Sequence, residues 1–268
     1  MKKDYHIRPT IDEVINNINL ISENYIIAEI NISEEDINKD IRIINSYEER
    51  IRHYNIRPIK DEANKYENEK EIKDNCKIKI NNNYIDFNYF YKFKEKGKFI
   101  IKYLFKNNIS KVDYIFNECK LLINIDLSNF NSQNITNIKG MFSWCESLKN
   151  INLSNFNTQN VEDMSRLFWG CESLTNIDLS YFKTKNVTHT SGMFCGCKSL
   201  TNLNLSNFDT KNVTNMYNMF YGCKSITNLN LSNFDTKNVT DMCGMFDGCK
   251  SLKIENVKTN DEKILKEL

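Results

Sequence analysis

The side chains most able to do chemistry in this chain are its nine cysteines, six of which recur at one fixed interval. The interval is 26 residues, and the cysteines that share it are Cys119, Cys145, Cys171, Cys197, Cys223 and Cys249. If the fold brings them together, such thiols could form disulfides, hold a metal ion or act as nucleophiles. They could also be one small apolar side chain that fills the same inward turn of a repeating structure.

The partners that thiol chemistry needs are scarce. His189 is the one histidine within the repeats, six residues before Cys195, and Asp163 lies one interval before His189. A Cys-His-Asp site would require these three side chains to converge. Neighbouring repeats carry Asn or Asp at the position of His189, which is typical of a polar turn. We therefore expect no catalytic residue, no metal site and no cofactor, and we interpret the six cysteines as reduced and buried.

Burial predicts how these thiols behave. A thiolate at an inward turn is desolvated, so its pKa should rise and its reactivity should fall. Cys195 and Cys243 lie at variable turn positions outside the series, and we expect them to react faster with thiol reagents. Replacing Cys197 with Ser is expected to lower the free energy of unfolding by about 1–3 kcal/mol if the buried hydroxyl stays unpaired. Replacing it with Ala is expected to lower it less.

The apolar residues follow the same interval and indicate the elements that hold the thiols. Within one repeat, Leu203 and Leu205 alternate with polar residues, as in a strand with one buried face. Val213, Met216 and Phe220 follow at steps of three to four residues, which suits a short helix or 3-10 turn. The interval also links Phe116, Phe142, Phe168, Phe194, Phe220 and Phe246, and Leu127, Leu153, Leu179, Leu205 and Leu231.

Stacking of the repeats is required because a single repeat cannot bury its own apolar side chains. The pattern therefore predicts an α/β fold, a leucine-rich-repeat-like solenoid in which parallel strands alternate with short helical turns. The strands are expected to centre near residues 125, 151, 177, 203 and 229. We assign the solenoid to residues 94–249 as six repeats, the first of them degenerate, and a C-terminal cap to residues 250–268.

Residues 1–93 are predicted to form a small α+β unit that covers the first repeat. A capping box, Thr10 with Glu13, predicts an amphipathic helix over about 11–23. The strongly charged segment 46–75 is expected to be a solvated helix or a mobile loop. The predicted strands are 25–32, 41–44, 76–80 and 84–87, the last two joined as a hairpin through Asn81–Asn83.

One run of residues recurs with little change along the repeats. It reads Leu205-Ser206-Asn207-Phe208-Asp209-Thr210-Lys211-Asn212-Val213-Thr214-Asn215-Met216, followed by Met219-Phe220-Tyr221-Gly222-Cys223. This run resembles the repeat of the BspA-like (bacterial surface protein A type) leucine-rich-repeat family, and the resemblance covers residues 94 to about 252. It implies a right-handed solenoid used for protein binding or adhesion, and it implies no catalysis. Secreted members of that family carry signal peptides and anchors, whose patterns we do not find here.

Composition and charge narrow the class of function. The net charge of +1 does not indicate binding to nucleic acid. The sequence also has no run of 18 apolar residues that could insert into a membrane. Without a recognisable secretory signal, we expect a cytoplasmic or otherwise intracellular protein, with the cell surface a less expected location. We predict a non-enzymatic protein-protein interaction scaffold whose partner is a protein. The alternatives are a cell-surface adhesin-like protein exported without a recognisable signal, and a thiol- or metal-binding protein that uses the cysteine series.

Two sets of side chains are candidates for contact with the partner. The first lies on the solvent face of the predicted strands: Lys149, Asn150, Asn152, Thr175, Asn176, Asp178, Thr201, Asn202, Asn204, Thr227, Asn228 and Asn230. The second consists of aromatic residues that differ from repeat to repeat: Trp144, Trp169, Tyr181, Tyr217 and Tyr221. Aromatic residues and Arg dominate the energetics of interfaces, and Arg166 also varies in this region. The alternative is that these rings pack locally or against the N-terminal unit.

Overall fold

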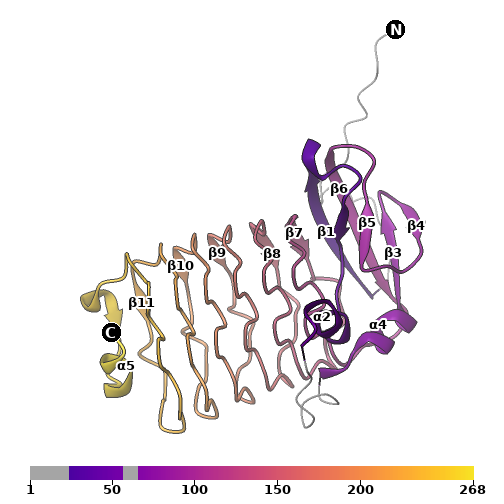
Figure 1. Cartoon of the computed structure of the whole chain (residues 1–268). Helices are drawn as coiled ribbons and strands as arrows, with labels where there is room; N and C mark the ends of the chain where they lie inside the picture. The colour runs from indigo at the N-terminus through magenta and orange to yellow at the C-terminus, as the bar shows by residue number, and fades with distance from the viewer. Residues whose placement is uncertain (1–23, 57–65) are drawn as a thin grey trace.

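The computed structural model describes residues 24–56 and 66–268 of the chain. A region of strands and two helices leads into successive repeats, which end in a short helix (Figure 1). The elements of the first region are β1 (Asn24–Ile32), η1 (Glu34–Asp36), β2 (Asp40–Arg42), α2 (Tyr47–Tyr54), α4 (Glu69–Asn75), β3 (Cys76–Ile80), β4 (Asn83–Ile85), β5 (Phe90–Lys92) and β6 (Gly97–Phe105). Those that follow are β7 (Leu122–Asp126), β8 (Asn150–Asn152), β9 (Asn176–Ile177), β10 (Asn202–Leu203), β11 (Leu229–Asn230), η2 (Ile254–Asn256), β12 (Val257–Lys258) and α5 (Glu262–Lys266).

Six of the strands form one mixed sheet in the order β4-β3-β6-β1-β7-β8. β1 pairs antiparallel with β6 on one side and with β7 on the other, whereas β7 and β8 are parallel. The middle strands β1 and β6 are almost continuous apolar runs, and most of their residues are buried. Asn81 and Asn82 turn the β3–β4 hairpin with positive φ values of 45° and 72°, a conformation that Asn tolerates. The sheet thereby joins the N-terminal strands directly to the strands of the repeats.

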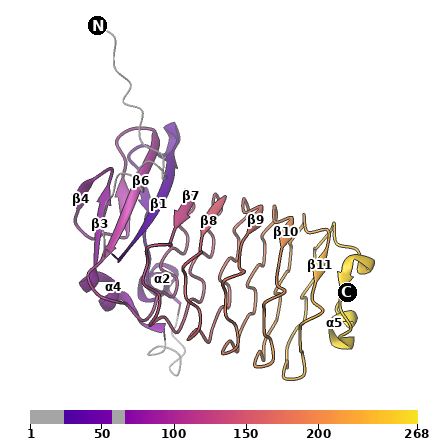
Figure 2. The ribbon, with the colours of Figure 1, turned by 180° about the vertical axis from the view of Figure 1, so that it is seen from behind.

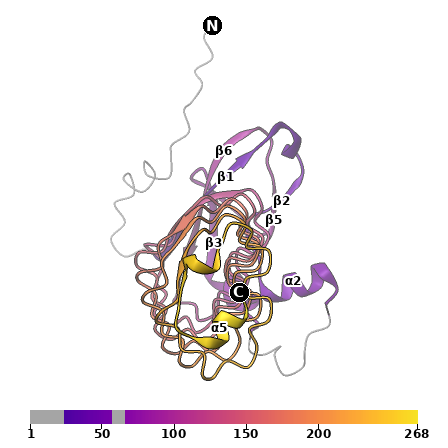
Figure 3. The same cartoon turned by 90° about the vertical axis from the view of Figure 1, so that its left-hand side faces the viewer.

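From β7 onward the repeats lie side by side, and a view along the array superposes them (Figures 1, 2 and 3). Their strands are two to five residues long, and β9 pairs parallel with β10. A second series of parallel bridges links Lys111, Asn137, Asp163, His189, Asn215 and Asp241. The rings from Phe116 to Phe246 stack in one column, with neighbouring centroids 5.7 to 5.8 Å apart. These contacts keep equivalent residues of successive repeats in register.

The predicted fold class is wrong. An α/β, leucine-rich-repeat-like right-handed solenoid requires parallel strands and short helical turns, but the largest sheet contains antiparallel strands and the other sheets have only two strands each. Residues 106–249, all of them described, contain no helix. Residues 97–105, expected to open a degenerate first repeat, instead form β6, which is antiparallel to both of its neighbours. The structure consists of small mixed sheets with few helices.

Backbone hydrogen bonds explain why the turn segments are not helical. The N–H of Phe194 donates to the carbonyl of Met219 in the next repeat at 2.9 Å, whereas a helix would direct it four residues back. The N–H of Met193 donates to the carbonyl of Thr190, three residues back, at 3.1 Å. Gly192 has a φ of 60°, which interrupts a right-handed helix. The apolar spacing of three to four residues therefore reflects a series of tight turns that bond to the neighbouring repeat.

Other predictions from the sequence have definite outcomes. Strands lie at the positions expected for 25–32, for the 76–80 and 84–87 hairpin, and for the five repeat strands near 125, 151, 177, 203 and 229. The strand expected at 41–44 is shorter and earlier, as β2. The charged segment 46–75 contains α2 and α4 among its described residues. The helix expected over 11–23 lies outside the described residues.

The last repeat is covered by β12 and α5. β12 pairs parallel with β11, and Asp261 at the start of α5 accepts the hydroxyl of Thr236 at 2.6 Å. One repeat earlier, the hydroxyl of Thr210 donates to the backbone carbonyl of Asp235 at 3.1 Å. The carboxylate of Asp261 therefore takes the place of a carbonyl from a following repeat, while Ile264 of α5 is fully buried.

Candidate functional site: an aromatic cleft beside helix α2

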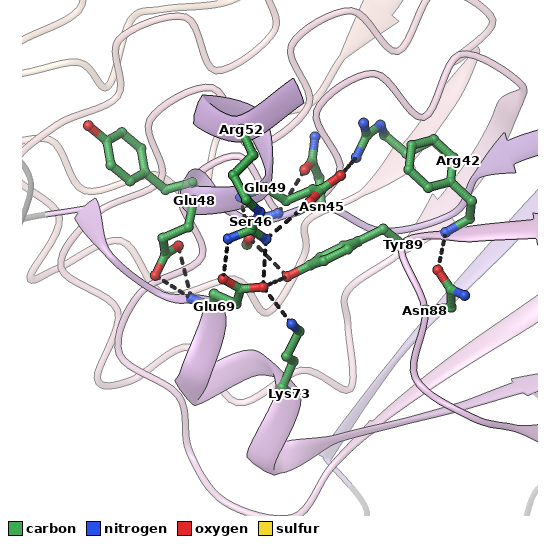
Figure 4. A network of polar contacts seen from close by, with 12 residues as sticks. Arg42, Asn45, Ser46, Glu48, Glu49, Arg52, Glu69, Lys73, Asn88 and Tyr89 are labelled. Atoms are coloured by element: carbon green, nitrogen blue, oxygen red, sulfur yellow. Dashed lines mark hydrogen bonds and ion pairs between the residues drawn. The ribbon is translucent and has the colours of Figure 1, made fainter. Parts of the chain in front are cut away.

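Helix α2 is held in place by a polar network that ties it to α4 (Figure 4). Arg52 of α2 donates to both carboxylate oxygens of Glu69, at 2.7 and 2.8 Å. Lys73 pairs with the same carboxylate at 2.6 Å, and the hydroxyl of Tyr89 donates to it at 2.7 Å. These contacts, with that of Arg52 the largest, lower the pKa of Glu69 to about 2 despite its partial burial. Glu69 is therefore ionised over the neutral and mildly acidic range and anchors α2.

A second set of contacts fixes α2 against the repeats. The side chain of Asn68 accepts the N–H of Tyr47 at 3.0 Å and donates to the carbonyl of Asp113 at 2.7 Å. The ring of Tyr47 packs with those of Tyr66 and Tyr114 in a buried cluster, with centroids 5.6 and 6.1 Å away. Asp113 and Tyr114 directly follow the first parallel bridge, Lys111–Asn137, so α2 lies next to the turns of the first repeats.

A cleft of about 560 Å³ lies between α2 and these turns. On the α2 side is Tyr54, whose hydroxyl donates to the carboxylate of Glu118. On the repeat side are the indole rings of Trp144 and Trp169. Partial desolvation, and to a smaller extent the hydrogen bond to Glu118, raises the pKa of Tyr54 to about 12. The phenol is therefore neutral at physiological pH, and the cleft offers several aromatic surfaces.

Two guanidinium groups also line the cleft, and each lies over an aromatic ring. The Cζ atom of Arg50 is 4.6 Å from the ring centroid of Tyr114, and that of Arg166 is 5.0 Å from the ring centroid of Trp169. Such placement is favourable because the face of an aromatic ring is electron-rich. Arg50 belongs to α2 and Arg166 to a repeat, so two separate elements bring positive charge to one cleft.

The rings are seated on glycines of the following repeat. A Cβ atom added to Gly170 would lie 2.8 Å from Cε3 of Trp144, and one added to Gly192 would lie 2.7 Å from Cε3 of Trp169. Both glycines have positive φ values, 73° and 60°, where other residues are strained. Trp144 itself has a φ of 61°. The backbone therefore fixes where these indoles lie, and the absence of a side chain in the next repeat leaves them room.

The predicted aromatic residues do not all come together. Trp144 and Trp169 line the cleft, and Tyr221, which is exposed, lies two intervals after Trp169 at the equivalent position. Tyr217 is exposed in the same turn as Tyr221. We call Tyr54, Trp144, Trp169, Tyr217 and Tyr221 the aromatic edge.

Tyr181 lies apart from the aromatic edge. It is exposed and does not line the cleft. In the next repeat its position is taken by Asn207, whose amide donates to the carbonyls of Leu179 and Phe182 at 3.0 and 2.8 Å. The position of Tyr181 therefore belongs to the turn that follows the strand, where Asn usually ties two repeats together.

The strand-face residues named from the sequence are all exposed. Most of them already use their side chains in hydrogen bonds within the fold. In four of them the side chain accepts the N–H of the Ser two residues later, at 2.9 to 3.2 Å. These four are Asn152, Asp178, Asn204 and Asn230. This is the Asx turn that ends each strand. The strand face is thus continuous and polar, but part of its hydrogen-bonding capacity is already used.

The sequence does not predict the α2 side of the cleft, because the high charge of segment 46–75 indicates a solvated helix or a mobile loop. A signal was present: Ser46 with Glu49 matches a capping box, and the Ser46 hydroxyl accepts the N–H of Glu49 at 3.0 Å. Tyr47, Ile51 and Tyr54 then recur at helical spacing. What the sequence does not contain is the surface on which this helix docks.

The cysteines of the series are buried, as predicted, and they have a role beyond filling space. The thiol of Cys197 donates to the carbonyl of Phe168 at 3.1 Å. Equivalent bonds of 3.0 to 3.2 Å are donated by Cys145, Cys171, Cys223 and Cys249. Burial is the largest cause of the raised pKa of each of these thiols. They are therefore protonated at neutral pH and join each repeat to the one before it.

The two cysteines outside the series differ from each other in burial, and their faster reaction with thiol reagents stays a prediction. Cys243 is exposed as expected, but Cys195 is buried, with 5% of its surface accessible, and burial raises its pKa to about 11. The equivalent residues one repeat before and after Cys195 are Trp169 and Tyr221. Large side chains on both sides shield a small one, which explains the burial of this thiol.

Among residues 24–56 and 66–268, no helix has the length and apolar character needed to cross the lipid bilayer. The same residues contain no group of three His, Cys, Asp or Glu side chains that could hold a metal ion. His189, considered above with Cys195 and Asp163, has its Nδ1 atom 2.8 Å from the hydroxyl of Thr188.

The fold and the cleft define a class of repeat protein. Its 26-residue repeats are joined by parallel bridges and stacked rings, and a mixed sheet and the helix α2 pack at one end of them. The model of the family described as "Mycoplasma protein of unknown function, DUF285" matches residues 87–201 and 171–266. The matched segments cover more than half of the chain, and the protein belongs to this family. No curated protein and no solved structure matches it. The resemblance to BspA-like proteins stays a prediction.

Proposed function

We propose that this protein is a non-enzymatic scaffold for protein-protein interaction, and that its partner binds along the aromatic edge. The observation that supports this most is the exposure of the rings. Tyr54, Trp144, Tyr217 and Tyr221 each keep between 41% and 50% of their surface accessible to solvent. Two of these rings, those of Tyr54 and Trp144, line the cleft. Large aromatic side chains left in water are typical of a contact surface, and such residues carry most of the binding energy at interfaces.

The rigidity of the edge supports the same function. Trp144 and Trp169 rest on Gly170 and Gly192, and Arg166 holds the face of Trp169. A surface that is already ordered loses little conformational entropy when a partner binds. The strand face is the secondary surface in this proposal, since Asn152 and its equivalents are engaged in turns.

We propose further that the protein acts inside a cell. The thiols of Cys171, Cys197 and Cys223 donate hydrogen bonds to carbonyls of the preceding repeat, at 3.1 to 3.2 Å. Each of these bonds requires the reduced, protonated form of the cysteine. Thiols persist in reducing compartments and are oxidised to disulfides mainly in secreted proteins. The stacking of the repeats is therefore suited to an intracellular environment.

The test is site-specific photo-crosslinking in the native cell. Tyr217 is replaced with benzoylphenylalanine, which keeps an aromatic ring at an exposed position of the edge. We expect one discrete crosslinked protein. We expect Trp144→Ala to reduce its capture, because loss of a hot-spot residue weakens the free energy of binding by about 2 kcal/mol or more.

Tyr84 of β4 provides the matched control, because it is exposed and lies outside the aromatic edge. Benzoylphenylalanine at position 84 should give no such product, and Tyr84→Ala should leave capture from position 217 unchanged. Equal products from both positions, or capture that is indifferent to Trp144→Ala, would show that the aromatic edge is not the contact surface.

A further inference from the structure

The two arginines of the cleft, Arg50 and Arg166, have no carboxylate partner among the residues that the structure describes. Among the described residues, Arg42 pairs with Glu49, and Arg52 pairs with Glu49 and Glu69. Within the same part of the chain, neither Arg50 nor Arg166 forms an ion pair, and each only lies over an aromatic ring. A guanidinium group has five N–H donors, so both arginines can still donate to an incoming acceptor.

The acceptors Glu118 and Ser143, which line the cleft, already accept hydrogen bonds within the protein. The carboxylate of Glu118 accepts the hydroxyl of Tyr54. The carbonyl of Ser143 accepts the side chain of Asn117 at 2.9 Å and the N–H of Glu118 at 2.8 Å. With two positive side chains and one negative side chain, the cleft has an excess of positive charge and of free donors. Its ligand should therefore supply negative charge and acceptors.

We propose that the cleft binds an acidic peptide segment, in which a Glu or Asp side chain lies between Arg50 and Arg166 and an adjacent aliphatic or aromatic side chain packs on Trp144 and Trp169. The planar guanidinium group matches a carboxylate in geometry and can donate two parallel hydrogen bonds to it. The indole faces add apolar contact beside the charge. This inference rests on the proposed function and names the chemistry of the partner.

A nucleic acid fits the observations less well. Its phosphates require an extended row of basic residues, whereas this chain has a net charge of +1 and the cleft contains two cationic side chains. A single carboxylate between two arginines needs no such row.

The chain offers a direct probe, because its only two tryptophans, Trp144 and Trp169, both line the cleft. The full-length, ¹⁵N-labelled protein is titrated with a capped peptide of sequence GELDFG and, separately, with its neutral counterpart GQLNFG. We expect GELDFG to shift both indole N–H signals in a saturable way, with a Kd on the order of 0.1–1 mM for so short a ligand. Raising the salt concentration should weaken this binding, and GQLNFG should give no saturable shift.

Charge-removing variants connect the binding to the two arginines. Arg50→Gln and Arg166→Gln are each expected to weaken binding of GELDFG about tenfold, as for the loss of one charge-assisted hydrogen bond. Arg166→Lys keeps the charge but lacks the planar guanidinium group, so its affinity for GELDFG should lie between those of the wild type and Arg166→Gln. The matched control is Lys211→Gln, an exposed cation of a later repeat, which should leave binding unchanged. Unaltered signals outside the cleft show that each variant is folded.

Several outcomes would overturn the proposal. Equal binding of the two peptides would show an apolar contact without acidic specificity, and the interaction function would stand. No shift with either peptide, or no effect of the arginine variants, would exclude an acidic peptide from the cleft. Indole shifts that depend on protein concentration alone would identify a second copy of the chain as the occupant, and shifts with oligo-dT alone would identify nucleic acid. Failure of the proposed function itself is distinguishable, because position 217 would then capture no protein in the cell.

Discussion

Asp113 is buried in surroundings that oppose its charge. It is fully buried, and neither of its carboxylate oxygens has a hydrogen-bond partner among the described residues. Burial, followed by the negative charge of Asp163, raises its pKa well above the usual value. The positive charge of Lys139 acts in the opposite direction on the pKa of Asp113, but the Lys139 ammonium lies 3.8 Å from Oδ2 of Asp163. Asp163 also accepts the hydroxyl of Tyr66 at 3.1 Å, so it is the better stabilised of the two carboxylates.

Replacing Asp113 with Asn is expected to raise the free energy of unfolding at pH 7, by about 1–3 kcal/mol, because the buried charge is removed. A raised pKa means that the folded chain binds the proton more tightly than the unfolded chain. The stability that this group contributes is fully present below about pH 4, which is the pKa of an Asp side chain in the unfolded chain. It is lost as the pH rises toward the pKa of Asp113 in the folded chain.

The variant and the wild type should therefore differ more at pH 7 than at pH 4 in urea denaturation. Asp241→Asn is the control, because Asn215 occupies the equivalent position in the repeat before it. A stabilisation that is the same at both pH values would show that the charge of Asp113 is not the cause.

Cys197 allows a second prediction at the scale of the residue, and it modifies the expectation from the sequence. The larger cost applies only if a Ser hydroxyl stays unpaired, and the carbonyl of Phe168 is available as its acceptor. Cys197→Ala should cost about 1 kcal/mol through loss of the thiol hydrogen bond, and Cys197→Ser should lie within about 1 kcal/mol of it. Urea denaturation measures both, with exposed Cys243→Ala as the unchanged reference. A Ser variant less stable than Ala by about 2 kcal/mol or more would mean that the hydroxyl does not reach Phe168.

At the scale of the element, the turns that carry the indoles can be tested with a matched pair of glycines. Gly170 and Gly196 both have a φ of 73°, so Ala at either position is strained by about 1–2 kcal/mol. Only at Gly170 would the new Cβ also meet Trp144, at 2.8 Å; at Gly196 the nearest atoms are 3.6 Å away. Gly170→Ala should therefore be less stable than Gly196→Ala by about 1–3 kcal/mol, and it alone should change the tryptophan fluorescence. Equal stabilities and spectra would mean that the indole is not seated on Gly170.

Helix α5 provides a prediction about the end of the array. Burial opposes ionisation of Asp261, but hydrogen bonds from Thr236 and from the N–H groups of Ile264 and Lys263 outweigh it and lower its pKa. A lowered pKa contributes stability that is present above about pH 4 and is lost as the pH falls through the folded value. Asp261→Ala should cost about 1 kcal/mol, as for loss of a helix cap, and speed hydrogen exchange of residues 229–249. Exchange of residues 122–152 should not change, and acceleration there as well would argue against a local role.

The elements also show how far the sequence could be used. The fixed interval located the repeat strands and the buried cysteines, because a residue type kept at one spacing marks one environment. It did not identify the partner of β6, since an apolar run such as Phe99 to Phe105 pairs equally well in either direction. It did not place α2 either, because Arg52 and Asn68 fix this helix through contacts with residues far away in the chain. Trp144 and Trp169 stay predicted contact residues, and their position in one cleft with Arg50 depends on that docking.

At the scale of the whole molecule, the two ends of the repeats are closed by different means (Figure 1). At one end β1 lies antiparallel beside β7 and covers what would otherwise be an open edge. At the other end Asp261 accepts a hydrogen bond from the last repeat, and Ile264 of α5 is buried. The repeats between them make the same kinds of contact, such as the stacked rings of Phe168 and Phe194.

This uniformity gives the molecule a scale of length. Each added repeat moves the far end away from α2 by one strand spacing, about 4.8 Å, without changing how neighbouring repeats fit together. Tyr221 lies two such steps beyond Trp169, so the reach of the aromatic edge is counted in whole repeats. Duplication or loss of the DNA for one repeat would resize this surface in fixed increments while the cleft and both closed ends stay intact. A single recombination event could therefore lengthen or shorten the aromatic edge by one repeat to match a partner.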